Sequence, residues 1–105
     1  MLLEMDRAMR ELNREVMNPV IPQLGIEDLK PAIAMVARAR AHYLKQFLLL
    51  AEQQNSCTPS ETNECVPSDE QIVNLRTARI AYDELASAAK AMETAIDRGY
   101  LDINP

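Results

Sequence analysis

Apolar residues in the first part of the chain recur at alternating spacings of three and four. This spacing places them on one side of an α-helix that extends from about residue 2 to residue 17. Charged residues occupy the other side, and Asn18-Pro19 ends the segment because a residue before proline avoids helical backbone angles. The chain is therefore predicted to begin with an amphipathic helix whose apolar stripe consists of Leu2, Met5, Met9, Leu12 and Val16.

A second helix is predicted from about residue 31 to residue 54. Pro31 suits a first helical turn, where the missing N–H is not needed. The C-terminal half of this segment is apolar on nearly all sides, whereas a helix with one solvent-exposed side would have polar residues there. We therefore expect this helix to lie between two neighbours, or between one neighbour and a second copy of the chain. Its predicted core stripe is Ile33, Ala37, Arg40, Leu44, Phe47 and Ala51.

A third helix is predicted from about residue 69 to residue 98. Ser68 and Gln71 form a capping box at its start, in which each side chain accepts a hydrogen bond from the other residue's backbone N–H. Gly99 fits the position that follows a helix, and the two residues after it are placed to fold back onto the last turn. A heptad pattern, which predicts a seam against another helix, comprises Leu75, Ala78, Tyr82, Leu85, Ala89, Met92 and Ile96.

These segments predict an all-α fold within one domain, residues 1–105. The connections are short, with a polar loop over 55–67, and short connections favour antiparallel neighbours. We therefore expect an antiparallel three-helix bundle with a long helical hairpin, which dimerisation would extend into a larger bundle. Only two glycines occur in the sequence, fewer than the turns of a sheet protein of this size would need.

The net charge of −5 and the absence of any Lys/Arg run argue against nucleic-acid binding, which requires a basic surface. No apolar run reaches the length that a membrane span needs, so none is expected. The first six residues become acidic too early for a signal peptide. The expected partner is another protein or a second copy of the chain.

The two cysteines, Cys57 and Cys65, both fall in the polar loop. A disulfide between them would indicate a periplasmic or secreted protein whose leader has been removed, whereas free thiols would indicate the cytoplasm. The C-x7-C spacing matches no common zinc motif, and no metal site is expected. The sequence leaves the disulfide and the free thiols as alternatives.

Three further residues in the two long helices are candidates for a polar role. Arg40 interrupts an apolar stripe and is expected to pair with Asp83 or Glu84 across the hairpin, which would fix its register. His42 is the only histidine, and its simplest interpretation is a surface position with its ring in water. A site built from Arg40, His42 and Asp83 is the alternative, as in a bundle that binds a small ligand.

No catalytic motif occurs in the sequence, and neither an enzyme nor a cofactor is expected. The leading hypothesis is a small non-catalytic module for protein interaction or assembly. An exported accessory or binding protein with a disulfide in its loop is the alternative, and the ligand-binding bundle is the third hypothesis. The expected interaction face consists of Met5, Met9, Leu12, Tyr43, Leu49 and Leu50.

Overall fold

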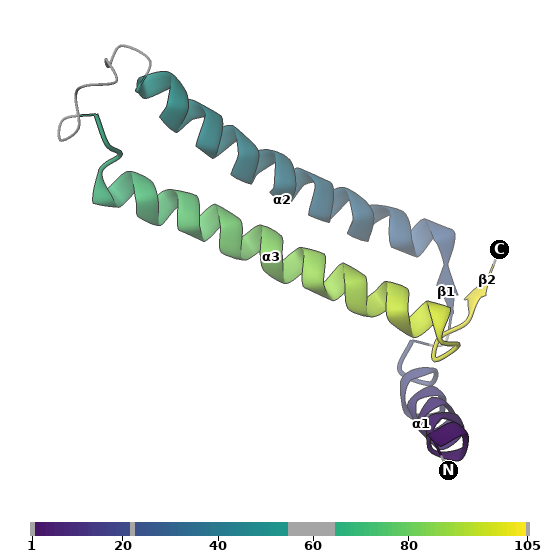
Figure 1. Ribbon diagram of the computed structural model, residues 1–105. Helices are drawn as coiled ribbons and strands as arrows, with labels where there is room; N and C mark the ends of the chain where they lie inside the picture. The colour runs from purple at the N-terminus through teal and green to yellow at the C-terminus, as the bar shows by residue number, and fades with distance from the viewer. Residues whose placement is uncertain (1, 22, 55–64, 105) are drawn as a thin grey trace. The chain divides into compact units, whose positions relative to one another are not determined.

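A computed structural model describes residues 2–21, 23–54 and 65–104 and consists mainly of α-helix (Figure 1). The all-α prediction is thus confirmed, although two strands of two residues each also occur in the described ranges. Across these ranges, no helix combines the length and apolar character that crossing a membrane requires. The elements in chain order are α1 (Leu2–Met17), β1 (Leu24–Gly25), α2 (Ile26–Gln53), α3 (Asp69–Asp97) and β2 (Ile103–Asn104).

The chain divides into two compact units, which we name the terminal unit and the central unit. The terminal unit comprises Met1–Ala34 and Ser87–Pro105, and the central unit comprises Met35–Ala86. Each unit therefore contains part of α2 and part of α3. The prediction of one domain over residues 1–105 and the bundle arrangement both stay predictions.

The helix boundaries follow local capping groups. α1 has the predicted bounds, and α3 ends one residue before the predicted position. α2 begins at Ile26, earlier than predicted, and Pro31 lies inside the helix. The backbone N–H of Gly25 donates a hydrogen bond of 2.8 Å to the Asp28 carboxylate, which is half of a capping box. This cap explains why α2 begins before its proline.

A small apolar cluster forms the core of the terminal unit. Leu24, Ala95 and Leu101 are buried, and partly buried side chains surround them. β1 and β2 pair in parallel beside this cluster, with Leu24 opposite Ile103 and Gly25 opposite Asn104 (Figure 1). Residues from the N-terminal and C-terminal parts of the sequence thus pack together in this unit. The surrounding side chains are Met17, Ile21, Leu29, Met92, Ile96, Tyr100 and Ile103.

Gly99 ends α3 in the predicted way. Its φ of 76° lies in the left-handed region, where glycine carries no steric penalty. The backbone N–H groups of Tyr100 and Leu101 both donate to the Ala95 carbonyl, at 2.8 and 3.3 Å. The chain therefore turns back on the last helical turn and places Leu101 in the core, only 2% exposed.

In the central unit, side-chain contacts join the parts of α2 and α3 that belong to this unit. Gln71 donates a hydrogen bond to the Gln53 side chain near one end, and the rings of Tyr43 and Tyr82 stack farther along, with centroids 6.2 Å apart. At the start of α3 the predicted capping box is confirmed. The Ser68 N–H donates to Gln71 Oε1 at 2.8 Å, and the Gln71 N–H donates to Ser68 Oγ at 3.2 Å.

Candidate functional site

α1 contacts the rest of the terminal unit through Arg14 on its polar side, and Met17 at its end packs against the apolar cluster. The Arg14 guanidinium donates two hydrogen bonds to the Asp102 carboxylate and a third, of 2.9 Å, to the Gly99 carbonyl. At 100° per residue, Arg14 lies almost opposite the centre of the apolar stripe. The attachment therefore leaves the stripe facing away from Asp102.

The charges at this attachment stabilise one another. The hydrogen bonds from Arg14 hold the pKa of Asp102 below its usual value, and they raise the pKa of Arg14 in turn. A hydrogen bond with Tyr100 likewise raises the pKa of Arg98. Arg14 and Asp102 are both about half exposed, so water screens the pair and its main effect is to orient α1. Sequence spacing could not have predicted a contact between residues 88 positions apart.

The apolar stripe of α1 is exposed along its whole length. No residue of this helix is buried, and each side chain in the stripe keeps more than half of its surface accessible. An apolar stripe of this length on a helix normally packs against a core or a partner. Its exposed fractions are 83% for Leu2, 59% for Met5, 52% for Met9, 61% for Leu12 and 68% for Val16.

The structure places the predicted interaction face in three environments. Met5, Met9 and Leu12 lie in the exposed stripe of α1, and Leu49 is also exposed. Tyr43 and Leu50 are half-buried, because they lie on the side of α2 that contacts α3. The sequence alone could not separate these groups because α2 is apolar on most of its circumference.

The less exposed side of α2 differs from the predicted core stripe. In the structure the half-buried residues of its central part are Val36, Ala39, Tyr43, Gln46 and Leu50. The predicted stripe is exposed instead: Ile33, Ala37, Arg40, Leu44, Phe47 and Ala51. Both sets have the same three-and-four spacing, so periodicity could not distinguish them, and the contacts with α3 select the first. On α3, by contrast, every residue of the predicted seam is half-buried or buried.

Arg40 contacts Tyr82 in the central unit. Its Nε donates a hydrogen bond of 3.1 Å to the Tyr82 hydroxyl, and its guanidinium carbon lies 5.2 Å from the centre of that ring. Within residues 2–21, 23–54 and 65–104 no salt bridge of Arg40 occurs, and its side chain is exposed. The ion pair with Asp83 or Glu84 stays a prediction.

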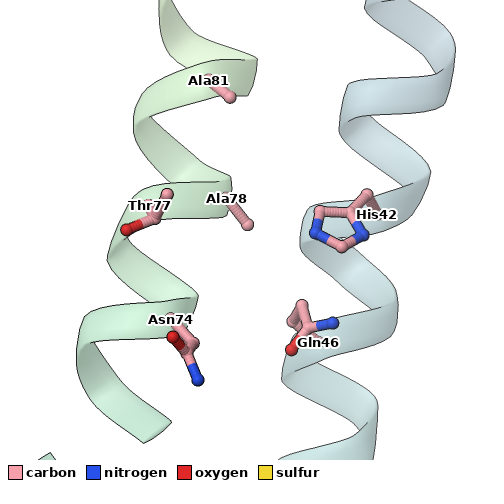
Figure 2. Close-up of a pocket in the computed structure, with 6 residues that line it drawn as sticks. All are labelled: His42, Gln46, Asn74, Thr77, Ala78 and Ala81. Atoms are coloured by element: carbon pink, nitrogen blue, oxygen red, sulfur yellow. The ribbon is translucent and has the colours of Figure 1, made fainter. Parts of the chain in front are cut away.

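An open hollow of about 390 Å³ lies between the two helices of the central unit (Figure 2). His42 and Gln46 line it from α2, and Asn74 and Thr77 from α3. Figure 2 shows Ala78 and Ala81 directed toward α2, so their small side chains leave the space open. The Thr77 hydroxyl donates to the Val73 carbonyl of its own helix at 3.0 Å. The structure does not bring His42, Arg40 and Asp83 together by any observed contact.

Cys57 lies outside the described residues, so the disulfide stays one of the two alternatives for the cysteines. The pairing of Cys57 with Cys65 stays a prediction. Among the residues that are described, no group of three or more His, Cys, Asp or Glu side chains is arranged to hold a metal ion.

Comparisons with known proteins add no relative: the chain matches no protein-family model, no curated protein and no solved structure. The candidate site therefore rests on the geometry of this chain alone, and it consists of the exposed stripe of α1.

Proposed function

We propose that this protein is a non-catalytic module for protein interaction and assembly, with the apolar stripe of α1 as its docking surface. The observation that carries the proposal is the orientation of α1, which is attached through Arg14 on its polar side. An attachment of this kind leaves the apolar residues available to a partner. Residues spaced at i, i+3 or i+4, and i+7 are the usual anchors of a helix that enters a groove on another protein.

The polar side of α1 favours a protein partner over a lipid surface. Helices that lie on membranes concentrate Lys and Arg on the polar face. Here three arginines stand beside four acids, and one of these acids, Asp6, forms a 3.1 Å ion pair with Arg10. A mixed surface of this kind offers no net attraction to anionic lipid. The proposed partner is therefore a protein with an apolar groove.

The arrangement of the two long helices is part of the same proposal. We infer that α2 and α3 pair as an antiparallel hairpin, which is supported by two contacts in the central unit. Gln53 near the end of α2 meets Gln71 near the start of α3, while Tyr43 meets Tyr82. A further helix, supplied by a partner or a second copy, would complete the bundle.

The test compares two variants of the full chain that lower the net charge by the same amount. Leu12→Glu places a carboxylate in the centre of the stripe, whereas Arg7→Gln removes a charge from the opposite side of α1. Each variant is used as bait, and retained proteins are cross-linked and located by mass spectrometry. We expect a partner that cross-links to α1, that is retained by the wild type and Arg7→Gln, and that is lost from Leu12→Glu. Equal retention by all three proteins would contradict the proposal.

A further inference from the structure

The charged residues of α1 are segregated on the two sides of its apolar stripe. Counted at 100° per residue, Glu4, Glu11 and Glu15 lie on one side, about 100–140° from the centre of the stripe. Arg10 and Arg14 lie on the other side, and both form the ion pairs described above. The three glutamates are exposed, and none of them forms a salt bridge within the described ranges. We call them the acidic edge, because a surface that packs on the stripe meets unpaired negative charge on this side.

The hollow between α2 and α3 shows which residues of the central unit lie on the opposite side of these two helices. His42 and Thr77 both line the hollow. Leu44 and Arg79 each follow by two residues, or about 200° of rotation, and therefore lie on the other side. Both are exposed, Leu44 by 49%. An apolar residue of α2 and a cation of α3 thus lie on the same side of the pair.

Further exposed residues extend this side along both helices. Phe47 lies one turn after Leu44 on α2 and is 57% exposed. On α3, Ile72, Arg76 and Arg79 follow one another at spacings of four and three, so they share one line of the helix. Neither arginine forms a salt bridge in the part of the chain that the structure describes. We call this set the basic face: Leu44, Phe47, Ile72, Arg76 and Arg79.

We propose that the basic face binds α1 of a second copy of this chain. This inference rests on the docking function proposed for α1 and names its partner. The apolar stripe of α1 covers the apolar residues of the basic face, while the acidic edge pairs with Arg76 and Arg79. The two surfaces are complementary, because one has unpaired acids beside its apolar residues and the other has unpaired cations.

The right-handed turn of α-helices sets the direction of α1 in this contact. With α2 and α3 antiparallel, an α1 that runs parallel to α3 has its acidic edge on the α3 side. The reverse direction would turn the acidic edge toward α2 and away from Arg76 and Arg79. Glu11 and Glu15 are four residues apart and the two arginines three apart, so both ion pairs form in one register.

This register leaves the other charges of the same side outside the apolar contact. The stacked tyrosine pair fixes the level of α2 against α3. With Glu15 beside Arg79, α1 ends at the level of Tyr82. Arg40 and Asp83 lie at or beyond that end, so the stripe buries no unpaired charge.

The size of the stripe predicts a reversible complex. Its five side chains leave on the order of 500 Å² accessible, whereas stable interfaces bury about 800 Å² per partner. Self-association is therefore expected in the micromolar range or above, and it should weaken in high salt because its ion pairs lie at the rim.

The first experiment measures self-association of the full chain by sedimentation equilibrium from micromolar to millimolar concentration. A variant with Arg76→Glu and Arg79→Glu reverses the charge of the basic face and leaves α1 unchanged. A control with Arg38→Glu and Lys45→Glu makes the same change in net charge at exposed positions on the outer side of α2. We expect at least a tenfold larger dissociation constant for the first variant, since like charges then meet, and a much smaller change for the control. A wild-type chain that stays monomeric at millimolar concentration, or equal effects of both variants, would overturn the inference.

A mixing experiment tests whether the contact joins two copies. A variant with Glu11→Arg and Glu15→Arg combines a cationic edge on α1 with an unchanged basic face, so it should not self-associate. The variant with Arg76→Glu and Arg79→Glu should not self-associate either. Mixing the two variants brings each edge against a face of opposite charge and should restore a dissociation constant close to that of the wild type. A mixture that stays monomeric would overturn the proposed contact.

The same measurement on Leu12→Glu separates this inference from the function proposed for α1. Self-association that survives Leu12→Glu would overturn the inference, because the stripe would not be the contact. A monomeric wild-type chain whose α1 cross-links to a different protein in the bait experiment would overturn the second copy as partner and leave the proposed function intact. Self-association that is lost both from Leu12→Glu and from the variant of Arg76 and Arg79 supports the inference.

Discussion

Leu101 in the terminal unit is 2% exposed, whereas Phe47 in the central unit, a larger apolar side chain, keeps 57% of its surface accessible. The terminal unit encloses its apolar cluster with residues from both ends of the sequence. In the described part of the central unit, only Ala78 is buried among the apolar residues. Apolar burial is the main source of folding free energy, so the two units should differ in how much they rely on a partner.

The apolar residues of the helices are also covered to different extents in the two units. In the terminal unit the last turn of α3 directs its apolar residues inward, and the chain after Gly99 covers them. In the central unit α2 has apolar residues on two sides, and α3 contacts one of them. Regions with few buried apolar contacts open at low free energy, which suits a surface that gains its packing on binding.

The largest expected effect is on the core of the terminal unit. Leu101→Ala removes a fully buried side chain and should lower the free energy of unfolding by about 2–5 kcal/mol. Leu48→Ala makes the same chemical change at an exposed position of the central unit and should cost no more than about 0.5 kcal/mol. Urea denaturation of both variants, monitored by circular dichroism, checks the difference. Similar losses would mean that the terminal unit is not the better-packed region.

A smaller effect is expected at the turn that brings Leu101 into the core. Gly99→Ala forces a side chain into the left-handed region at φ 76°, which costs about 1–2 kcal/mol. The other glycine provides the control. A Cβ at Gly25 would meet the Asp28 carboxylate at 3.6 Å, an ordinary contact, and the backbone there is not left-handed. Thermal unfolding should therefore show a lower Tm for Gly99→Ala than for Gly25→Ala.

Local signals in the sequence predicted the helices and their ends. The capping box of Ser68 and Gln71 and the C-terminal Gly99 each depend on neighbouring residues, and both were confirmed. The exposed stripe on α1 lies at its predicted spacing. Residue spacing does not predict which of the two apolar sides of α2 packs against α3. Tyr43 and Leu44 are both apolar, and only the contact with α3 distinguishes them.

The other features that the sequence could not predict are contacts between residues far apart in the chain. The pairing of β1 with β2 involves two residues on each strand, too few for any periodic pattern. The attachment of α1 joins Arg14 to Asp102, and nothing near either residue indicates the other. The candidate docking surface therefore could be predicted as a stripe, but the polar attachment that exposes it could not.

In the central unit, a change of about 1 kcal/mol is expected at the start of α3. Ser68→Ala removes the hydroxyl that accepts from the Gln71 N–H, and the loss of such a cap typically costs about 1 kcal/mol. Ser87→Ala, at an exposed position inside the same helix, should be neutral or slightly stabilising. Hydrogen exchange should accelerate in the first turn of α3 for Ser68→Ala and stay unchanged in its last turn. Faster exchange at both ends would indicate that the two units unfold together.

The smallest expected effect is on the contact between Arg14 and Asp102, which orients α1. The pH dependence of stability measures its contribution. The pKa of Asp102 is lower in the folded chain, because Arg14 donates hydrogen bonds to its carboxylate. The folded state therefore binds this proton less tightly than the unfolded state does. The contribution is fully present above the usual pKa of an aspartate and is lost as the pH falls through the lowered folded value.

Asp102→Asn should accordingly reduce the urea midpoint slightly at neutral pH and leave it unchanged in strong acid, where the wild-type carboxylate is protonated as well. High salt should shrink the neutral-pH difference, since both partners are exposed to solvent. Asp83→Asn, at a carboxylate with no ion pair in the described residues, serves as the control for the loss of one negative charge. An Asp102→Asn difference that persists unchanged into acid would mean that neutral hydrogen bonds, and not the charge on Asp102, hold α1 to the terminal unit.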